Sequence, residues 1–193
     1  MRIIGGYLKG KNLYFEKNNK IRPTKNIVRE AIFDILGDEV KNRKILDVFA
    51  GTGALGIESL SRGADFVVLV ENSIESLSLL KKNIHSLGIE NKAKIILSSA
   101  ERAIKNFSKN GEIFDIIFAD PPYYYEGKKI EKIFKFSQGC VKYRSILIIE
   151  TFYKAKMPEI SNNWQMVKEK KYSSTKISIY EYERDNCRIS GQF

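Results

Sequence analysis

The fold is decided by the stretch Asp47-Val48-Phe49-Ala50-Gly51-Thr52-Gly53-Ala54-Leu55-Gly56. This stretch ends a short apolar run and opens a helical pattern, so it predicts a strand, a tight turn and a helix. Gly51 and Gly53 allow the tight turn and the close approach of a ligand, while Gly56 allows the helix to pack closely on the strand. A nucleotide-like cofactor is therefore expected to lie across this turn.

Strand-like and helical patterns alternate on both sides of the turn. We expect parallel strands at 45–49, 66–71, 93–98, 114–120 and 145–150, with helices near 54–62, 73–87, 100–108 and 128–138. Such alternation predicts βαβ units. Two further strand-like runs, 165–172 and 176–183, predict a closing antiparallel hairpin. The expected fold class is α/β, with a mostly parallel seven-stranded sheet.

A smaller extension precedes this sheet. Residues 2–15 predict a β-hairpin that turns at Lys9-Gly10-Lys11, and residues 27–36 predict an amphipathic helix that Thr24 caps and Gly37 ends. A chain of 193 residues suits one hydrophobic core. We expect an N-terminal extension over 1–40, a catalytic domain over 41–185 and a tail over 186–193.

The net charge of +10 is concentrated at the N-terminus. Residues 1–29 carry eight basic residues against one acidic residue, which leaves a net charge of +3 for the rest of the chain. A polyanion such as RNA or DNA suits this distribution, because neutralised phosphates release counterions. A lysine-rich solvated surface would explain it as well. Lys9, Lys11 and Lys17 are the candidate phosphate contacts.

Composition excludes several classes of protein. The longest aliphatic runs, such as Val67–Val70 and Ile146–Ile149, are too short to cross a bilayer, and the first residues lack the apolar core of an export signal. Cys140, Cys187 and His85 are too few for a disulfide framework or a metal cluster. We expect a cytoplasmic protein without a metal.

Acidic residues at two strand ends refine the cofactor prediction. Glu71 lies 20 residues after Gly51, where a carboxylate can accept both hydroxyls of a ribose. The glycines and Glu71 also fit a dinucleotide site, and a turn that needs flexible residues would explain the glycines alone. Asp47 favours the ammonium group of a methionine, because a carboxylate at that position would repel a pyrophosphate.

A second chemical motif, Asp120-Pro121-Pro122-Tyr123, follows the apolar run 114–119. Successive prolines hold the chain extended and leave carbonyl groups free. Carbonyl and carboxylate oxygens can accept the N–H groups of an exocyclic amine, and an aromatic ring can stack on the base that carries it. A Pro-Pro stop after a strand, capped by a tyrosine, is the simpler alternative.

Together these features resemble Rossmann-like class I methyltransferases that depend on S-adenosyl-L-methionine, and the Pro-Pro motif is similar to that of enzymes acting on exocyclic amines. The chain is most similar to the RsmD family of bacterial 16S rRNA guanine-N2 methyltransferases. The likeness is carried by Met1–Gly6, by Arg22-Pro23-Thr24 with Val28–Phe33, by Asp47–Gly56 and by Ser61–Ala64. Ser98-Ser99-Ala100-Glu101 departs from it, because related enzymes often carry an acidic residue before the alanine.

The resemblance implies methyl transfer to N2 of a guanine in 16S rRNA, free or within the assembling small subunit. It implies catalytic roles for Asp120 and Pro121, whose oxygens would accept the N2–H bonds, and for Tyr123, which would stack on a flipped-out base. The implied cofactor contacts are Asp47, Phe49, Gly51, Gly53, Glu71, Asn72, Ser99 and Ala100. The candidate substrate contacts are Arg22, Thr24, Lys9, Lys11 and Lys17.

Three other functions stay open from the sequence. A DNA amino-methyltransferase, such as an N6-adenine enzyme, would share the Pro-Pro motif, but the chain leaves little room for a separate recognition domain. An NAD-dependent oxidoreductase would explain only the glycines and Glu71. An RNA-binding module without activity would explain only the charge.

Overall fold

The computed structural model describes residues 1–15, 26–122, 127–158, 160 and 163–183. The helices are α1 (Asn26–Leu36), α2 (Ala54–Ser61), α3 (Ile74–Leu87), α4 (Ala100–Lys109) and α5 (Lys128–Ser137). The strands are β1 (Lys44–Asp47), β2 (Phe66–Glu71), β3 (Ala93–Leu97), β4 (Phe114–Ala119), β5 (Val141–Phe152), β6 (Trp164–Tyr172) and β7 (Thr175–Tyr182). Short 3₁₀ helices are η1 (Gly37–Val40), η2 (Glu90–Lys92) and η3 (Gln138–Cys140).

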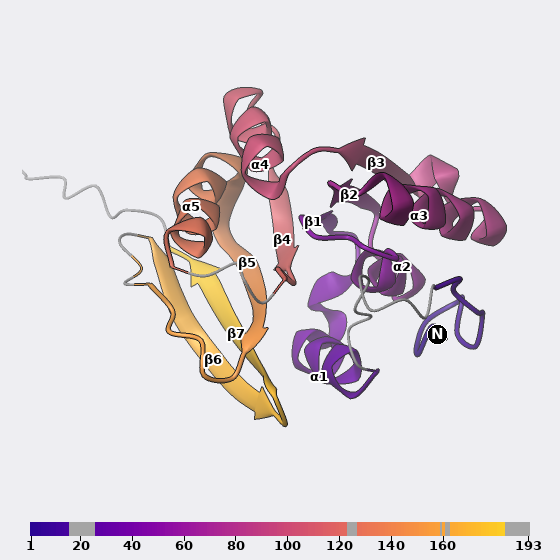
Figure 1. Ribbon diagram of the computed structural model, residues 1–193, viewed down its shortest axis with the longest axis horizontal. Coiled ribbons are helices and arrows are strands. Elements are labelled where there is room, and N and C mark those ends of the chain that lie inside the picture. The colour runs from indigo at the N-terminus through magenta and orange to yellow at the C-terminus, as the bar shows by residue number, and fades with distance from the viewer. Residues whose placement is uncertain (16–25, 123–126, 159, 161–162, 184–193) are drawn as a thin grey trace, which may run out of the picture.

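The strands form one sheet in the order β3-β2-β1-β4-β5-β7-β6 (Figure 1). Strands β1 to β5 are parallel, and β7 is antiparallel to both β5 and β6. The predicted α/β class and its closing antiparallel hairpin are therefore confirmed. The chain order reverses between β1 and β4, and in open α/β sheets ligands bind beyond the carboxyl ends of the strands at such a point.

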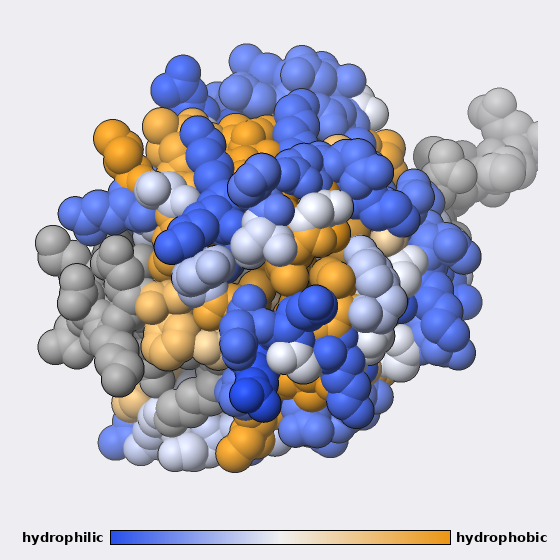
Figure 2. Space-filling view, turned by 90° about the vertical axis from the view of Figure 1, so that its right-hand side faces the viewer, coloured by the Kyte–Doolittle hydropathy of each residue, from blue (hydrophilic) through white to orange (hydrophobic). Residues whose placement is uncertain are grey.

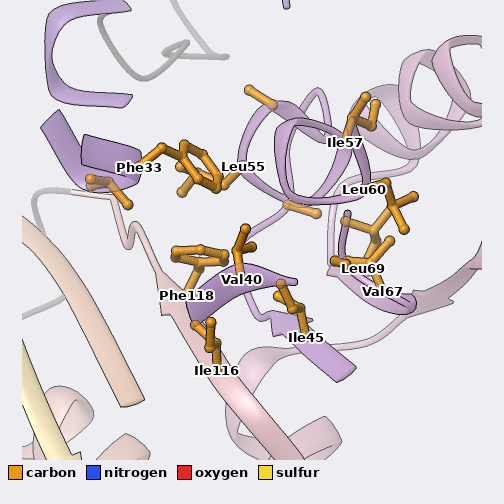
Figure 3. Packing of buried hydrophobic residues seen from close by; sticks show 14 of the residues in the cluster. Phe33, Val40, Ile45, Leu55, Ile57, Leu60, Val67, Leu69, Ile116 and Phe118 are labelled. Atoms are coloured by element: carbon orange, nitrogen blue, oxygen red, sulfur yellow. The ribbon is translucent and has the colours of Figure 1, made fainter. Parts of the chain in front are cut away.

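Two hydrophobic clusters cover the two faces of the sheet. One contains Phe33, Leu55, Leu60 and Phe118, so α1 and α2 pack on this face (Figure 3). The other contains side chains of α4 and α5, such as Phe107 and Phe134. Alternate residues of each strand belong to different clusters: Val67 and Leu69 of β2 to the first, Val68 and Val70 to the second. Successive side chains of a strand point to opposite faces of the sheet, and both faces are covered here. This explains why β2 is apolar throughout.

Gly56 sets the distance between α2 and the sheet. A Cβ atom added at this glycine would overlap the side chains of Leu69 and Val67 on β2. The close helix-to-strand packing predicted from the sequence is confirmed. Every residue of α2 is buried, because the helix lies between the sheet and the N-terminal segment.

The N-terminal segment is an antiparallel loop with a single bridge, Arg2 to Asn12, in place of the two strands predicted. Some of its backbone donors bond within the loop, as the Ile3 N–H does to the Lys11 carbonyl and the Leu13 N–H to the Met1 carbonyl, and others go to α2. The Glu58 carboxylate accepts the N–H groups of Ile4 at 2.8 Å and Gly5 at 2.7 Å. The Ser61 hydroxyl accepts the N–H of Leu8 at 3.0 Å.

The β5 strand begins at Val141, four residues before its predicted start. The pattern missed the first residues of β5 because Lys142, Tyr143 and Arg144 are exposed and form no apolar run. The register against β4 shifts between Phe114 and Ile116, and the Ser145 hydroxyl bridges the irregularity by donating to the Phe114 carbonyl at 2.9 Å.

Seen from the side of α3 and the N-terminal segment, the surface is mostly hydrophilic, with hydrophobic side chains visible between the charged ones (Figure 2). Among the described residues, no helix combines the length and the apolar character needed to cross a membrane.

Candidate functional site

The carboxyl ends of three neighbouring strands bring the predicted site together. The Val48 N–H donates to the Phe118 carbonyl at 3.0 Å, and the Ala50 N–H donates to the Val70 carbonyl at 2.9 Å. These bonds hold the segment after β1 between β4 and β2. Asp47, Glu71 and Asp120 therefore lie at one edge of the sheet, at the reversal of strand order.

Glu71 holds the glycine turn in place. Its Oε2 atom accepts the N–H of Gly51 at 2.8 Å. Its Oε1 atom accepts the N–H groups of Asn72 and Ser73, each at 2.8 Å. A carboxylate offers about four lone-pair positions, so at least one position on Oε2 is left for a ribose hydroxyl. The sequence pattern did not predict this second role of Glu71 as an anchor for backbone groups.

Gly51 and Gly53 have different reasons to be glycine. Both adopt positive φ angles, +53° and +82°. A Cβ atom at Gly51 would meet nothing within 4 Å, so open space lies above this backbone. A Cβ atom at Gly53 would lie 2.6 Å from Leu80 Cδ1 and 2.9 Å from Ile57 Cδ1. Gly51 thus has room for a ligand to approach its backbone, whereas Gly53 is required by the core beneath the turn.

Asp47 is a buried acid at the end of β1, with 1% of its surface exposed. Burial raises the pKa of Asp47 to about 7 from an ordinary 3.8, a hydrogen bond from the Phe49 N–H partly offsets this, and the Asp120 carboxylate raises the pKa further. A site with Asp47, Asp120 and Glu71 at one edge favours a cationic ligand. The ammonium and sulfonium groups of S-adenosyl-L-methionine fit it, and a pyrophosphate does not.

The affinity of this site for S-adenosylhomocysteine should depend on pH. Below a pKa of about 7 the free protein holds Asp47 protonated, and pairing with the ligand ammonium requires the proton to leave. Affinity should therefore rise with pH and level off above pH 7, and it should be about tenfold weaker at pH 6 than at pH 8. Calorimetry in two buffers of different ionisation enthalpy measures both the affinity and the released proton.

The matched variant for this measurement is Asp47→Asn. It should bind more weakly at pH 8 and lose the pH dependence between pH 6 and pH 8. Equal affinity of the unmodified protein at both pH values, with no proton released, would show that Asp47 does not pair with the ammonium.

The Pro-Pro motif continues β4 into the same edge. Asp120 is partly exposed, so its carboxyl group borders the site. Pro121 is buried. The Phe33 ring of α1 lies 6.0 Å from the Phe118 ring, centroid to centroid, and closes one side of the strand end. Tyr123 lies outside the described residues.

The remaining predicted cofactor residues flank the ends of β1, β2 and β3. Phe49 is partly buried against the second cluster, and Asn72 is exposed directly after Glu71. Ser99 caps α4 by accepting the Arg102 N–H at 3.4 Å, and Ala100 is buried. The serine therefore performs a capping role, which an acidic side chain in related sequences could also perform.

Two exposed apolar side chains were not predicted as site residues. Leu97 pairs with Glu71 in the sheet register and is 53% exposed, and Ile74 in the first turn of α3 is 75% exposed. Leu97 is the last residue of β3 and Ile74 follows the end of β2, so a flat apolar ring could rest between these strand ends. In the sequence they appear only as apolar residues near a strand end. Such residues are too common to indicate a binding site.

Asn83 is the other residue that the sequence did not mark. It is fully buried on α3, on the same face as Leu80 and Ile84. Its amide nitrogen donates to the Thr52 carbonyl at 2.9 Å and to the Tyr14 carbonyl at 3.0 Å, and its oxygen accepts the Tyr14 N–H at 2.7 Å. Asn83 thus fastens the N-terminal segment to the glycine turn. The sequence does show a polar residue on the apolar face of a helix, and such a buried residue is expected to form hydrogen bonds.

The predicted substrate residues fall into two groups. Arg22, Thr24 and Lys17 lie outside the described residues. Lys9 and Lys11 are exposed on the N-terminal loop, which docks on the last turn of α2. That turn is about 12 Å along the helix from the glycine turn. These lysines are therefore not brought to the strand ends where Asp120 lies.

One of the eight basic N-terminal residues belongs to the core. Arg29 is fully buried, with Nε 3.7 Å from Glu58 Oε2, and it donates to the Arg2 carbonyl and to Asn26 Oδ1. Its charge balances Glu58, which receives backbone N–H groups of the N-terminal loop. This arginine fixes the loop and does not contribute to a basic surface.

Comparison with known proteins gives consistent matches over nearly the whole chain. A family model described as "Conserved hypothetical protein 95" matches residues 1–181. The ribosomal RNA small subunit methyltransferase D of Buchnera aphidicola from Acyrthosiphon pisum is 37% identical over 182 residues, covering 93% of this chain and 91% of that protein. Its counterpart in Escherichia coli K12 is 31% identical over 184 residues, covering 95% and 90%.

A solved structure agrees with these sequence matches. The structure described as "Putative methyltransferase yhhF from Escherichia coli" superposes with a TM-score of 0.82 at 29% identity. The match covers 95% of this chain and 98% of that chain.

Proposed function

Because the chain belongs to the Conserved hypothetical protein 95 family, the RsmD family of methyltransferases, we propose that it methylates small-subunit ribosomal RNA. S-adenosyl-L-methionine is the methyl donor. The acceptor that we propose is the exocyclic N2 of a guanine. The site suits methyl transfer to an amine, because Asp47 and Glu71 lie at the same sheet edge as the Asp120 motif. The methyl donor and the amine could therefore be held next to each other.

The single observation that carries the proposal is the buried acid Asp47 beside Asp120. A buried carboxylate is unfavourable unless a cation pairs with it. When bound, S-adenosyl-L-methionine supplies a methyl group activated by a positively charged sulfur. Asp47 would hold the ammonium, Glu71 would accept a ribose hydroxyl through Oε2, and Gly51 would let the ligand approach its backbone. An NAD site would place phosphate charge against the same acids.

Asp120 and Pro121 would prepare the acceptor amine. The lone pair of guanine N2 is delocalised into the ring, so the nitrogen is a poor nucleophile. The Asp120 carboxylate and the Pro121 carbonyl would accept its N–H bonds and hold it in line with the methyl group. The same oxygens would stabilise the positive charge that develops on nitrogen. Tyr123 would stack on the flipped-out base.

The organisation of the chain follows from this role. Residues 41–185 would form the catalytic domain, residues 1–40 would contact RNA beside it, and residues 186–193 would be a tail. With ribosomal RNA or an assembling small subunit as the partner, we place the protein in the cytosol.

The test of the proposal is transfer of a tritiated methyl group to small-subunit RNA. Naked RNA and RNA within isolated particles are compared as substrates, and the modified base is mapped. We expect N2-methylguanine in small-subunit RNA. Methylation of an adenine or of DNA would contradict the proposed acceptor, and the absence of transfer to every RNA substrate would contradict the proposed activity.

The N-terminal lysines should bind RNA without affecting the cofactor. Replacing Lys9, Lys11 and Lys17 with alanine should raise KM for RNA. The slope of log affinity against log salt should flatten by about 0.7 to 0.9 for each lysine–phosphate pair removed. Affinity for S-adenosylhomocysteine should not change, because Lys9 and Lys11 are exposed on the loop that docks at the far end of α2.

The matched control removes the same charge elsewhere. Lys105, Lys109 and Lys135 are exposed on α4 and α5, on the opposite face of the sheet, and their replacement with alanine should leave the salt slope unchanged. If both triple variants behave alike, the N-terminal lysines act only through net charge.

A further inference from the structure

Phe152–Lys156, the last residue of β5 and the turn that follows it, reaches the same sheet edge as the Asp120 motif. Strands β4 and β5 are parallel neighbours, and Ala119 is opposite Ile149. Continuing this register along both chains places Thr151 level with Pro121. Phe152–Lys156, named here the β5 turn, therefore begins just beyond the proposed acceptor site.

The backbone of the β5 turn is held in place by the β6–β7 hairpin. The Tyr153 N–H donates to the Ser174 carbonyl at 3.0 Å, and the Ala155 N–H donates to the Phe152 carbonyl at 2.9 Å. Lys176, which is almost fully buried, donates from Nζ to the Ala155 carbonyl at 3.3 Å. The turn is thus a fixed platform, because its conformation is set by bonds to a neighbouring strand.

The platform presents an aromatic face and positive charge to solvent. The Tyr153 side chain is 36% exposed, and the rings of Phe152 and Tyr153 are 4.8 Å apart between centroids. The Lys154 ammonium lies 5.5 Å from the centre of the Tyr153 ring. Lys154 and Lys156 are exposed, and Ala155 between them is buried. An exposed ring followed by two lysines combines the stacking surface and the positive charge that proteins use to bind single-stranded nucleic acid.

Positive charge continues from the β5 turn onto the hairpin. Lys170 and Lys171 are exposed at the end of β6, and Lys171 pairs with Lys176 across the hairpin. The Glu169 carboxylate is 3.3 Å from Lys176 Nζ, so this acid is already paired within the protein. A phosphate backbone that passes the Asp120 motif towards the hairpin would meet lysines along this path.

We propose that the β5 turn is a second nucleotide-binding site for the RNA strand. Tyr153 stacks on a base that flanks the methylated nucleotide, while Lys154 and Lys156 contact the neighbouring phosphates. This inference rests on the proposed RNA methyltransferase activity. Its physical reason is that a flipped-out base leaves its neighbours unstacked, and an aromatic surface beside the acceptor site replaces part of the lost stacking.

The first test measures binding of a labelled single-stranded fragment of small-subunit RNA by fluorescence anisotropy. Tyr153→Ala should weaken binding by about 5- to 150-fold, the range expected for loss of one stacked base. Tyr153→Phe should bind as the unmodified protein does. The control is Tyr143→Ala, because Tyr143 is 61% exposed on the same strand but near its opposite end.

The second test concerns the two lysines. Replacing Lys154 and Lys156 with alanine should flatten the salt slope by about 0.7 to 0.9 for each lysine–phosphate pair removed. The control pair Lys105 and Lys109 should not change the slope. Affinity for S-adenosylhomocysteine and the melting temperature, measured on every variant, should stay at the level of the unmodified protein.

The outcomes separate this inference from the proposed function. If the unmodified protein methylates RNA and Tyr153→Ala keeps its RNA affinity and its KM, the second nucleotide site is overturned and the activity stands. If RNA binding depends on Tyr153 but no methyl group is transferred, the proposed activity fails and the binding site stands.

Discussion

Replacing Asp120 with alanine is expected to lower kcat for RNA methylation by about 30- to 10³-fold, which corresponds to about 2 to 4 kcal/mol in the activation barrier. The carboxylate would accept an N–H bond of the guanine amine and face the positive charge that develops on nitrogen. Removing one such preorganised group typically costs this much. Single-turnover methyl transfer at saturating RNA and cofactor measures the effect directly.

Two companion variants make this result specific. Asp120→Asn keeps an oxygen that accepts hydrogen bonds but loses the charge, so its rate should lie between those of the alanine variant and the unmodified protein. Asp38→Ala removes an exposed acid that pairs with Lys41, and it should have the normal rate. Affinity for S-adenosylhomocysteine should survive in all three. A normal rate for Asp120→Ala would refute the catalytic assignment.

Replacing Glu71 with alanine should cost about 2 to 4 kcal/mol in affinity for S-adenosylhomocysteine, because two effects combine. The ribose loses a charged acceptor. The N–H groups of Gly51, Asn72 and Ser73 lose the carboxylate that orders the glycine turn. Calorimetry gives the change in affinity, and thermal unfolding without ligand gives the part that comes from the turn.

The control for this change is Glu75→Ala, which removes an exposed acid four residues later, in the first turn of α3. It should leave ligand affinity unchanged. Glu71→Gln should fall between the two, since its amide keeps one acceptor oxygen. Unchanged affinity in Glu71→Ala would mean that the end of β2 does not face the cofactor.

Local patterns in the sequence predicted most of the sheet and the location of the site. The apolar runs at β1 to β4 and the helical spacing between them lie at nearly the expected residues, because period and burial are linked within one element. The N-terminal hairpin and the start of β5 were less well predicted. In both, hydrogen bonds to distant residues act beside the local pattern: Glu58 and Ser61 bind the N-terminal loop, which keeps antiparallel bonds of its own, and Ser145 bonds Phe114 at β5.

The prediction of the site was similarly divided. The positions of Asp47, Gly51, Glu71 and Asp120 at strand ends followed from the motifs, and parallel strands then bring their ends to one edge. Their individual roles did not follow. The sequence pattern assigned Gly53 only a cofactor role, and the structure adds a packing reason, because a Cβ atom at this position would overlap Leu80 and Ile57.

The order of the elements, the α/β class and the family could all be predicted from the sequence, because they depend on motifs of neighbouring residues. Which charges are buried and what they contact became clear from the folded chain. Arg29 became a core residue paired with Glu58, Asp47 acquired a pKa of about 7, and Asn83 joined Tyr14 to Thr52. Each outcome depends on burial or on partners distant in the sequence, as in the 69-residue separation of Tyr14 and Asn83. Desolvation and hydrogen bonding act through space, so no local pattern encodes them.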